Sequence, residues 1–293
     1  MSALSALLDS LLDYAGLFPP AKLPMAEAVR NHAAYAHGQH AAMLGRFILP
    51  SARLAEFETA YAPLTASQKS GWRISLLSGT DASADAAAIA AFNQRHPGAC
   101  IDAVEAKASS PAEIAALSAA FPSSLELWIE IPSNADPTPL LAAIKSAGRG
   151  AKIRTGGVTP DAFPPAADIA RFLAACHTAG VACKATAGLH HPLRADYRLT
   201  YEPGSASGTM FGFLNVFLAA ALVHSGGSTA DATALLADSD AANFSCAHGV
   251  LAWRGHRFDA AQLTAVRGAL CRSFGSCSFT EPIEGLQELH WLS

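Results

Sequence analysis

Two lysines carry the clearest chemical signal in this sequence. Lys152 opens the segment KIRTGG and Lys184 lies within VACKATAGLHHP, and the interval between them is that of one strand–helix–strand unit. Such a unit sets both lysines in neighbouring parallel strands at similar height, with Arg154 on the same strand face as Lys152. A desolvated amine beside other cations gives up its proton easily and then attacks carbonyl carbon. The pattern therefore predicts lysine-assisted chemistry, with the pKa of Lys184 depressed by Lys152 and Arg154.

Other polar side chains fall in further predicted strands, near the ends that converge at the mouth of a barrel enzyme. Glu130 is expected to move protons, and Arg154 to clamp a carboxylate or phosphate through two parallel hydrogen bonds. The remaining side chains expected to contact substrate are Arg46, Glu105, Lys107, Thr155, Thr186, His190 and His191. Together these residues predict a site for a small anionic compound.

His190 and His191 leave a second chemistry open. Adjacent histidines on an extended strand point to opposite sides, but Pro192 makes a turn reasonable. In a turn, one or both imidazoles could bind a divalent metal together with Glu130 or His248. Hydrogen bonding to substrate and a purely structural role are the other possibilities for the two histidines. The preferred interpretation uses hydrogen bonding and needs no metal or other cofactor.

The elements that must position these residues alternate regularly between strand and helix. Six strands, each followed by a helix, recur at near-constant spacing, which is typical of a parallel α/β fold. The strand sequences are MLGRFILP, WRISLLSG, CIDAVEAKA, LELWIEIP, GAKIRTGG and VACKATAGLHHP. Helix starts are expected near Ser51, Asp81, Pro111 and Pro137, whose side chains suit the first positions of a helix.

The two ends of the chain complete the predicted fold. Residues 1–40 are expected to form an N-terminal helical extension. The assignments outside the six units are helices over Ser2–Asp13, Met25–Gly38, Asp231–Ala237 and EPIEGLQELHWL, a hydrophobic helix that ends near Ser225, strands at NFSCA near Ser245 and at FGSCSF near Ser276, and a hairpin over Val250–Arg257. Eight strands in a single domain over 1–293 predict a TIM-type (β/α)8 barrel. An open doubly wound sheet is the alternative, although no G-x-G-x-x-G follows the first strand.

Composition narrows the classes of partner. Hydrophobic residues make up 51% of the 293 residues and charged residues 15%, and the formal net charge is −4. No basic tail or basic helix face is present to meet the phosphates of a nucleic acid. The chain does not start like a signal peptide, and the apolar run Met210–Val223 contains Asn215 and is too short to span a bilayer. A soluble, cytoplasmic protein is expected, either alone or as a homo-oligomer.

The six cysteines are scattered and include no C-x-x-C pair. In a cytoplasmic chain this favours buried free thiols over disulfides or a zinc site. Cys277, at the end of the last predicted strand, could be a nucleophile only beside a histidine and in an electropositive setting. The sequence alone does not supply that setting.

Two segments carry a resemblance to a known family. KIRTGG and CKATAGLHHP resemble the paired lysine strands of deoxyribose-phosphate-type class I aldolases, in which a Lys-Thr-x-Thr-Gly strand is followed by a Lys-Ala-x-Gly-Gly strand. The resemblance implies that Lys152 forms the Schiff base and that Lys184 tunes it. Arg154 stands in place of a small residue, and GLHHP replaces the Gly-Gly-Ile turn and the phosphate loop. Related chemistry is therefore implied, but not a phosphorylated sugar.

A second resemblance covers most of the chain. LDYAGLFPPA, KIRTGG, KATAGLHHPLR, GFLNVF and FGSCSFTEPIE together resemble a bacterial family of uncharacterised proteins, which implies no activity. The residues themselves predict an aldolase-like enzyme that acts on a small anionic carbonyl compound by lyase or proton-transfer chemistry. A metal-dependent lyase or hydrolase that uses the two histidines, and a barrel that only binds a ligand, are the alternatives.

Overall fold

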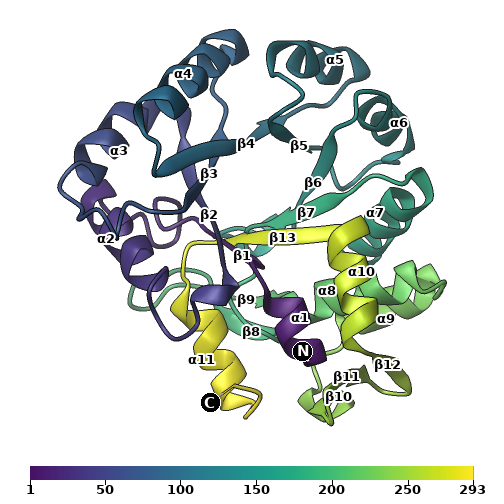
Figure 1. Ribbon diagram of the computed structural model, residues 1–293. Helices are drawn as coiled ribbons and strands as arrows, with labels where there is room; N and C mark the ends of the chain where they lie inside the picture. Colours follow the sequence, from purple (N-terminus) through teal and green to yellow (C-terminus); the bar gives the residue numbers. More distant parts are fainter. Residues whose placement is uncertain (293) are drawn as a thin grey trace.

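Eight parallel strands close into a barrel, with helices around it (Figure 1). The computed structural model describes residues 1–292. In order around the barrel the strands are β1 (Leu12–Tyr14), β2 (Leu44–Pro50), β3 (Trp72–Leu77), β4 (Ala99–Lys107), β5 (Glu126–Glu130), β6 (Gly150–Arg154), β7 (Cys183–Thr186) and β13 (Cys271–Ser276), which pairs with β1. The predicted TIM-type barrel is confirmed, because strands and helices alternate so that each strand is covered on its outer face.

The helices begin where the sequence provides capping residues. The Asp81 carboxylate accepts a hydrogen bond from the backbone N–H of Ala84, and the Ser110 hydroxyl accepts one from Glu113. The α-helices are α1 (Ala3–Leu8), α2 (Met25–Tyr35), α3 (Leu54–Tyr61), α4 (Ala82–Arg95), α5 (Pro111–Ala120), α6 (Thr138–Ser146), α7 (Ala166–Ala179), α8 (Phe213–His224), α9 (Thr229–Ala237), α10 (Ala260–Ala269) and α11 (Thr280–Glu288). None of the helices in the described residues combines the length and apolar character needed to cross a membrane.

The first barrel strand lies where the sequence pattern predicted a helix. The helix expected over Ser2–Asp13 ends at Leu8, and Leu12–Tyr14 pairs in parallel with β13 on one side and β2 on the other. All three residues of β1 are buried. The local sequence is equally compatible with an apolar helix face, so the choice is made by pairing with two strands that are distant in the chain. The N-terminal extension therefore contains helices and also closes the barrel.

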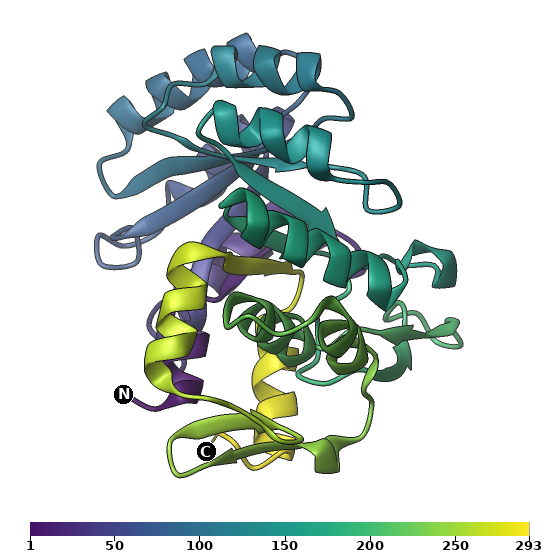
Figure 2. The ribbon, with the colours of Figure 1, turned by 90° about the vertical axis from the view of Figure 1, so that its right-hand side faces the viewer.

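The segment NFSCA is a strand, but it does not belong to the barrel. β10 (Phe244–Ala247) pairs antiparallel with β11 (Val250–Trp253), and β11 pairs antiparallel with β12 (His256–Phe258). The φ angles of His248 and Gly249 are 51° and 76°, which suits a tight two-residue hairpin turn. A strand so connected cannot join a parallel barrel. The small sheet lies beside the amino terminus (Figure 2), where the Ala3 N–H donates to the Gly249 carbonyl.

A second hairpin and a buried helix follow the strand that carries Lys184. β8 (Ala195–Arg198) and β9 (Ser207–Met210) pair antiparallel, and the chain then enters α8, in which every residue from Phe213 to Val223 is buried. This helix packs against α7, α9 and α10. Burial within the chain accounts for its apolar sequence, and an intersubunit surface is not needed to explain it.

Candidate active site

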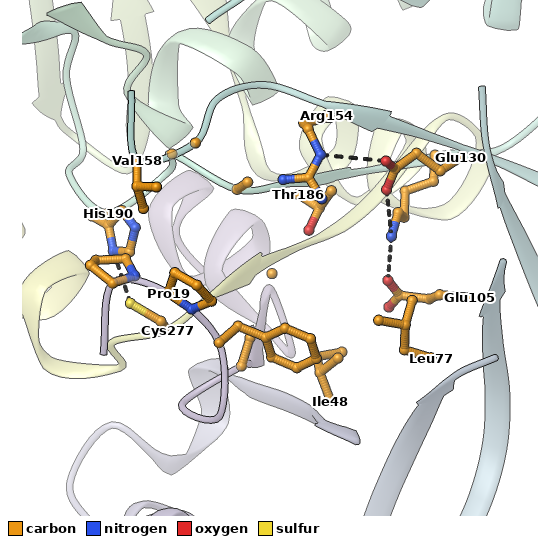
Figure 3. A pocket seen from close by; sticks show the side chains of 18 of the residues that line it. Pro19, Ile48, Leu77, Glu105, Glu130, Arg154, Val158, Thr186, His190 and Cys277 are labelled. Atoms are coloured by element: carbon orange, nitrogen blue, oxygen red, sulfur yellow. Dashed lines mark hydrogen bonds and ion pairs between the residues drawn. The ribbon is translucent and has the colours of Figure 1, made fainter. Parts of the chain in front are cut away.

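The carboxyl ends of the barrel strands surround a cavity of about 360 Å³ (Figure 3). Each of seven barrel strands places a residue near its end in the wall of this cavity: Ile48, Leu77, Lys107, Glu130, Arg154, Thr186 and Gly275. The segment after β1 adds Ala15, Phe18, Pro19 and Pro20. This is the end of the barrel at which TIM-type enzymes carry their active sites.

Buried charges of alternating sign connect the barrel core to the cavity. Lys152 Nζ lies 2.8 Å from Glu105 Oε2 and 2.9 Å from Glu130 Oε2. Lys184 Nζ lies 2.7 Å from Glu105 Oε1 and 2.6 Å from Asp13 Oδ2. The order is therefore Asp13, Lys184, Glu105, Lys152 and Glu130, which we call the charge chain. Every buried cation in it has two carboxylate partners, as a buried charge requires.

Strand register brings the two lysines together. Lys152 of β6 is the direct partner of Lys184 of β7, and Glu130 of β5 is the direct partner of Lys152. Parallel strands in step keep such residues at one height, so the prediction drawn from the spacing of the lysines is confirmed. Glu105, on the neighbouring strand β4, reaches both amines.

The structure departs from the prediction for Lys184 in two ways, its protonation state and its position relative to the cavity. Burial disfavours its charge, but Asp13 and Glu105 outweigh burial and raise its pKa above the usual value. The expected depression of its pKa was wrong because the neighbours of its amine are carboxylates and not the other cations. Its side chain is 1% exposed and lies outside the cavity wall, whereas Lys152 forms part of that wall. Of the two lysines, only Lys152 lines the cavity.

The carboxylates of the charge chain are held ionised by their neighbours. Burial alone would raise the pKa of Glu105, but Lys152 and Lys184 bring it far below the usual value. Burial opposes the charge of Glu130 in the same way, and Lys152, Arg154 and Lys107 lower its pKa. These shifts favour the charged form of both groups at neutral pH.

The outer end of the charge chain is cationic. Arg154 Nε lies 3.4 Å and Lys107 Nζ 3.6 Å from Glu130 Oε1, and their side chains are 47% and 69% exposed. From the core to the mouth, the three carboxylates of the charge chain therefore stand against four cations: Lys184, Lys152, Arg154 and Lys107. The excess positive charge lies at the mouth. Such a mouth favours the entry of an anion.

Other predicted site residues divide into those on the cavity and those beside it. Thr186 and His190 line the cavity, as expected. Thr155 is buried and donates from its hydroxyl to the carbonyl oxygens of Thr186 and Ala187, at 3.2 and 2.6 Å. It therefore fixes the turn after β7 and does not face a ligand.

His191 lies on a different cavity. Its ring stacks on Tyr197 at 3.5 Å between centroids, in the wall of a neighbouring cavity of about 430 Å³. Burial lowers its pKa to about 4, so the ring is neutral near pH 7. His190 points to the first cavity and carries its own partners, so the two histidines are not arranged to share a ligand. In residues 1–292 no three His, Cys, Asp or Glu side chains are grouped to hold a metal ion.

Arg46 lies away from the mouth, contrary to its predicted role. Its Nε is 2.6 Å from Asp102 Oδ1 and its Nη2 is 3.1 Å from Glu126 Oε2. Arg46 and Glu126 stand near the amino ends of β2 and β5, so this arginine joins strands at the opposite end of the barrel. Its position early in strand β2 was the sequence signal that could have placed it away from the mouth.

Asp13 is a site residue that the sequence pattern did not reveal. Its carboxylate accepts hydrogen bonds from the Ser273 hydroxyl and the Arg46 backbone N–H, each at 2.7 Å, besides its contact with Lys184. LLDSLLDY contains two acids, Asp9 and Asp13, and only a strand assignment for the second half of this segment would have singled out Asp13. The segment after it lines the mouth.

Comparison of the chain with protein-family models, curated proteins and solved structures finds no match. Function is therefore inferred from the geometry and chemistry of the cavity.

Proposed function

We propose that this protein is an enzyme that acts on a small anionic carbonyl compound through an imine formed by Lys152. The observation that carries the proposal is the placement of one buried lysine in the wall of a cationic cavity, with its amine between two carboxylates, of which Glu130 also lies at the cavity. Imine formation lets a lysine withdraw electrons from the bond next to the carbonyl carbon. The reaction class is an aldolase-like cleavage or a proton transfer at that carbon.

The two lysines have different roles in this proposal. Lys152 is the nucleophile because its side chain lines the cavity, and Lys184 is a positioning residue because it is held beneath by Asp13 and Glu105. The local resemblance to deoxyribose-phosphate-type aldolases implies the same division. Lys184 also occupies one oxygen of Glu105, which orients the other oxygen towards Lys152.

Substrate binding provides a way to remove the proton from the Lys152 amine. A substrate carboxylate or phosphate that binds Arg154 and Lys107 draws these cations away from Glu130, whose contacts with them are long. The proton affinity of Glu130 then rises, and a proton can move from Lys152 Nζ to Glu130 Oε2. The neutral amine adds to the carbonyl carbon, and the carbonyl oxygen takes a proton. That oxygen leaves as water when the imine forms.

Glu130 is the acid and base for the later steps. It returns the proton to the carbinolamine oxygen and can then remove a proton from the carbon or hydroxyl next to the imine. Thr186 and His190 also line the cavity and provide hydrogen bonds to the rest of the substrate. The proposal needs no metal, and it places the enzyme in the cytoplasm with a small molecule as its partner.

Trapping with borohydride tests the proposed imine. The protein is mixed with glyoxylate or pyruvate, reduced, and digested for mass mapping of modified lysines. A reduced adduct is expected at Lys152, because, of the two buried lysines, only this one lines the cavity. Lys107 is an internal control, since its amine is exposed at the same mouth and reports non-specific labelling.

The variant for this test is Lys152→Arg, which keeps the charge between Glu105 and Glu130 but cannot form an imine. Labelling at this position should fall to background in the variant and persist in a Lys145→Arg control, whose lysine lies on the surface helix α6. Equal labelling of Lys107 and Lys152, or no adduct at Lys152 with any carbonyl compound tried, would contradict the proposal. Binding of these anions without an adduct would favour a barrel that only binds a ligand.

A further inference from the structure

A second group of reactive side chains lies on the wall of the cavity opposite the charge chain. His190 follows β7, and Cys277 follows β13, and both line the cavity (Figure 3). Tyr201, from the turn between β8 and β9, and Glu281, in the first turn of α11, complete the group. The lysine chemistry proposed for Lys152 does not use Cys277, Tyr201 or Glu281.

The geometry of this group is that of a thiol beside a supported histidine. Cys277 Sγ lies 3.9 Å from His190 Nδ1 and 3.7 Å from the hydroxyl oxygen of Tyr201. Glu281 Oε2 lies 3.1 Å from His190 Nδ1 and accepts a hydrogen bond from Tyr201 at the same distance. The other ring nitrogen, Nε2, has no protein partner among the described residues and lies on the far side of the ring from Cys277 (Figure 3). It is therefore free to meet a ligand.

The charge on this group is set by His190. Burial opposes protonation of its ring, but Cys277 and Glu281 outweigh burial and raise its pKa to about 9. The pKa of Glu281 is lowered, because His190 and Tyr201 outweigh the effect of burial. Burial raises the pKa of Tyr201 and of Tyr14, the two phenols that also face Cys277, so both remain neutral. One imidazolium therefore lies 3.9 Å from the sulfur, where it can stabilise negative charge that develops on the sulfur during a reaction.

The other cysteines lack this environment. Cys176, Cys183 and Cys271 lie together in the core, and hydrogen bonds among them together with burial raise the pKa of Cys183 and Cys271 well above the usual value. Burial also raises the pKa of Cys100, which lies on the surface. A thiol raised in this way is a poor nucleophile near neutral pH.

We propose that Cys277 and His190 form a second reactive centre of the cavity, in which the sulfur adds reversibly to the carbonyl carbon of a small anionic aldehyde. The C–S bond forms as the π bond of the carbonyl breaks; the oxygen takes a proton from His190, and the proton that leaves the sulfur returns to His190. The product is a thiohemiacetal, and His190 ends in its starting state, so no oxidant or reductant is needed. The choice of an aldehyde rests on the proposed function, but the reactive thiol does not.

Alkylation by iodoacetamide tests the reactive thiol. At about pH 6.5, Cys277 should be alkylated roughly tenfold faster than Cys100, because His190 lies beside its sulfur and stabilises the charge that develops there, whereas burial raises the pKa of Cys100. Solvent exposure alone would make alkylation of Cys100 faster than that of Cys277, since Cys277 is only 5% exposed and Cys100 is an exposed residue. Mass mapping after short reaction times gives both rates in one sample of the unmodified protein. Faster alkylation of Cys100 would overturn the proposal.

Neighbouring histidines give a matched pair of variants. His190→Gln should slow alkylation of Cys277 to the rate of an ordinary thiol, whereas His191→Gln should leave it unchanged, because His191 stacks on Tyr197 instead. An equal rate in wild type and His190→Gln, with both proteins folded by circular dichroism, would show that the imidazolium does not activate the sulfur.

Protection by glyoxylate tests the addition to an aldehyde. Glyoxylate should slow alkylation of Cys277 both in wild type and in Lys152→Arg, in which no imine can form at residue 152. Absence of protection in both proteins would overturn the addition step. Protection together with failure to trap an imine at Lys152 would support Cys277 and contradict the lysine proposal, so the two failures are distinguishable.

Discussion

Lys184 shows how a cation survives in the core of a barrel. Removing an ammonium group from water costs several kcal/mol, and the cost is offset only where partners satisfy the charge. Asp13 and Glu105 provide these partners at 2.6 and 2.7 Å, and the Ser75 hydroxyl donates to Glu105 at 3.0 Å. The side chain therefore stabilises the barrel only as a member of the charge chain.

Replacement of Lys184 by Met should destabilise the protein by about 3–5 kcal/mol near neutral pH, because two buried carboxylates each lose a cationic partner. The measurement is the free energy of unfolding by urea. A Lys145→Met variant is the control, because Lys145 is exposed and makes one hydrogen bond, to the Gly180 carbonyl. That variant should change the free energy by less than about 1 kcal/mol.

The same pair of proteins gives a pH test. The folded-state pKa of Glu105 lies below its unfolded value, so its contribution to stability is present above the usual glutamate range, near 4.5, and is lost as the pH falls below it. The difference between wild type and Lys184→Met should therefore shrink as the pH falls, because protonation removes the buried charge of Glu105, which the variant leaves with one lysine partner instead of two. A difference that stays constant down to about pH 3 would show that lost packing, and not charge, explains the variant.

At the scale of the elements, Asn215 joins parts of the chain that the barrel itself does not connect. It lies fully buried in the first turn of the apolar helix α8. Its amide nitrogen donates to the carbonyl oxygens of Leu235 and Asp238 at 2.8 and 2.9 Å, and its amide oxygen accepts from the Arg194 backbone N–H at 2.9 Å. One side chain thus ties α8 to the end of α9 and to the loop before β8.

Asn215→Ala should lower the free energy of unfolding by about 3 kcal/mol, because three backbone groups lose their partner in a buried site. Thermal unfolding followed by circular dichroism measures the effect. Thr233→Val is the control, because the Thr233 hydroxyl donates only to the Thr229 carbonyl, which remains bonded within α9. A loss in Asn215→Ala no larger than in the control would contradict the assigned role of the asparagine.

The whole molecule is closed by residues from its two ends. β1, near the amino terminus, lies between β2 and β13, and it brings Asp13 to Lys184 (Figure 1). Closure removes the exposed strand edges that β2 and β13 would otherwise present. The first strand therefore serves both the architecture and the charge balance of the core.

A chain that lacks residues 1–14 should fail to form a rigid barrel. If these residues were only a dispensable helical extension, their removal would not have this effect. We expect loss of the near-ultraviolet circular dichroism signal, binding of a hydrophobic dye and loss of the cooperative unfolding transition. Removal of Met1 alone is the control, because its side chain is 91% exposed. A cooperative transition in the truncated chain, with the wild-type midpoint, would mean that β1 is not required for closure.

The sequence by itself determined the repeating part of the fold. Six strands from β2 to β7 follow from apolar runs at constant spacing, and several helices follow from capping residues such as Asp81 and Ser110. The spacing of Lys152 and Lys184 predicted their pairing, because register in a parallel ladder is regular along the chain. These features depend on local sequence and on neighbouring units.

Only the tertiary structure decided the features that depend on residues far apart in the chain. Leu12–Tyr14 becomes a strand because β2 and β13 flank it, and NFSCA is excluded from the barrel because its hairpin turn reverses it. The proton on Lys184 is fixed by Asp13 and Glu105, which lie on other strands. Electrostatic energy depends on distance in space, which sequence spacing does not give for separate strands, so the charge state of the site could be read only from the folded chain.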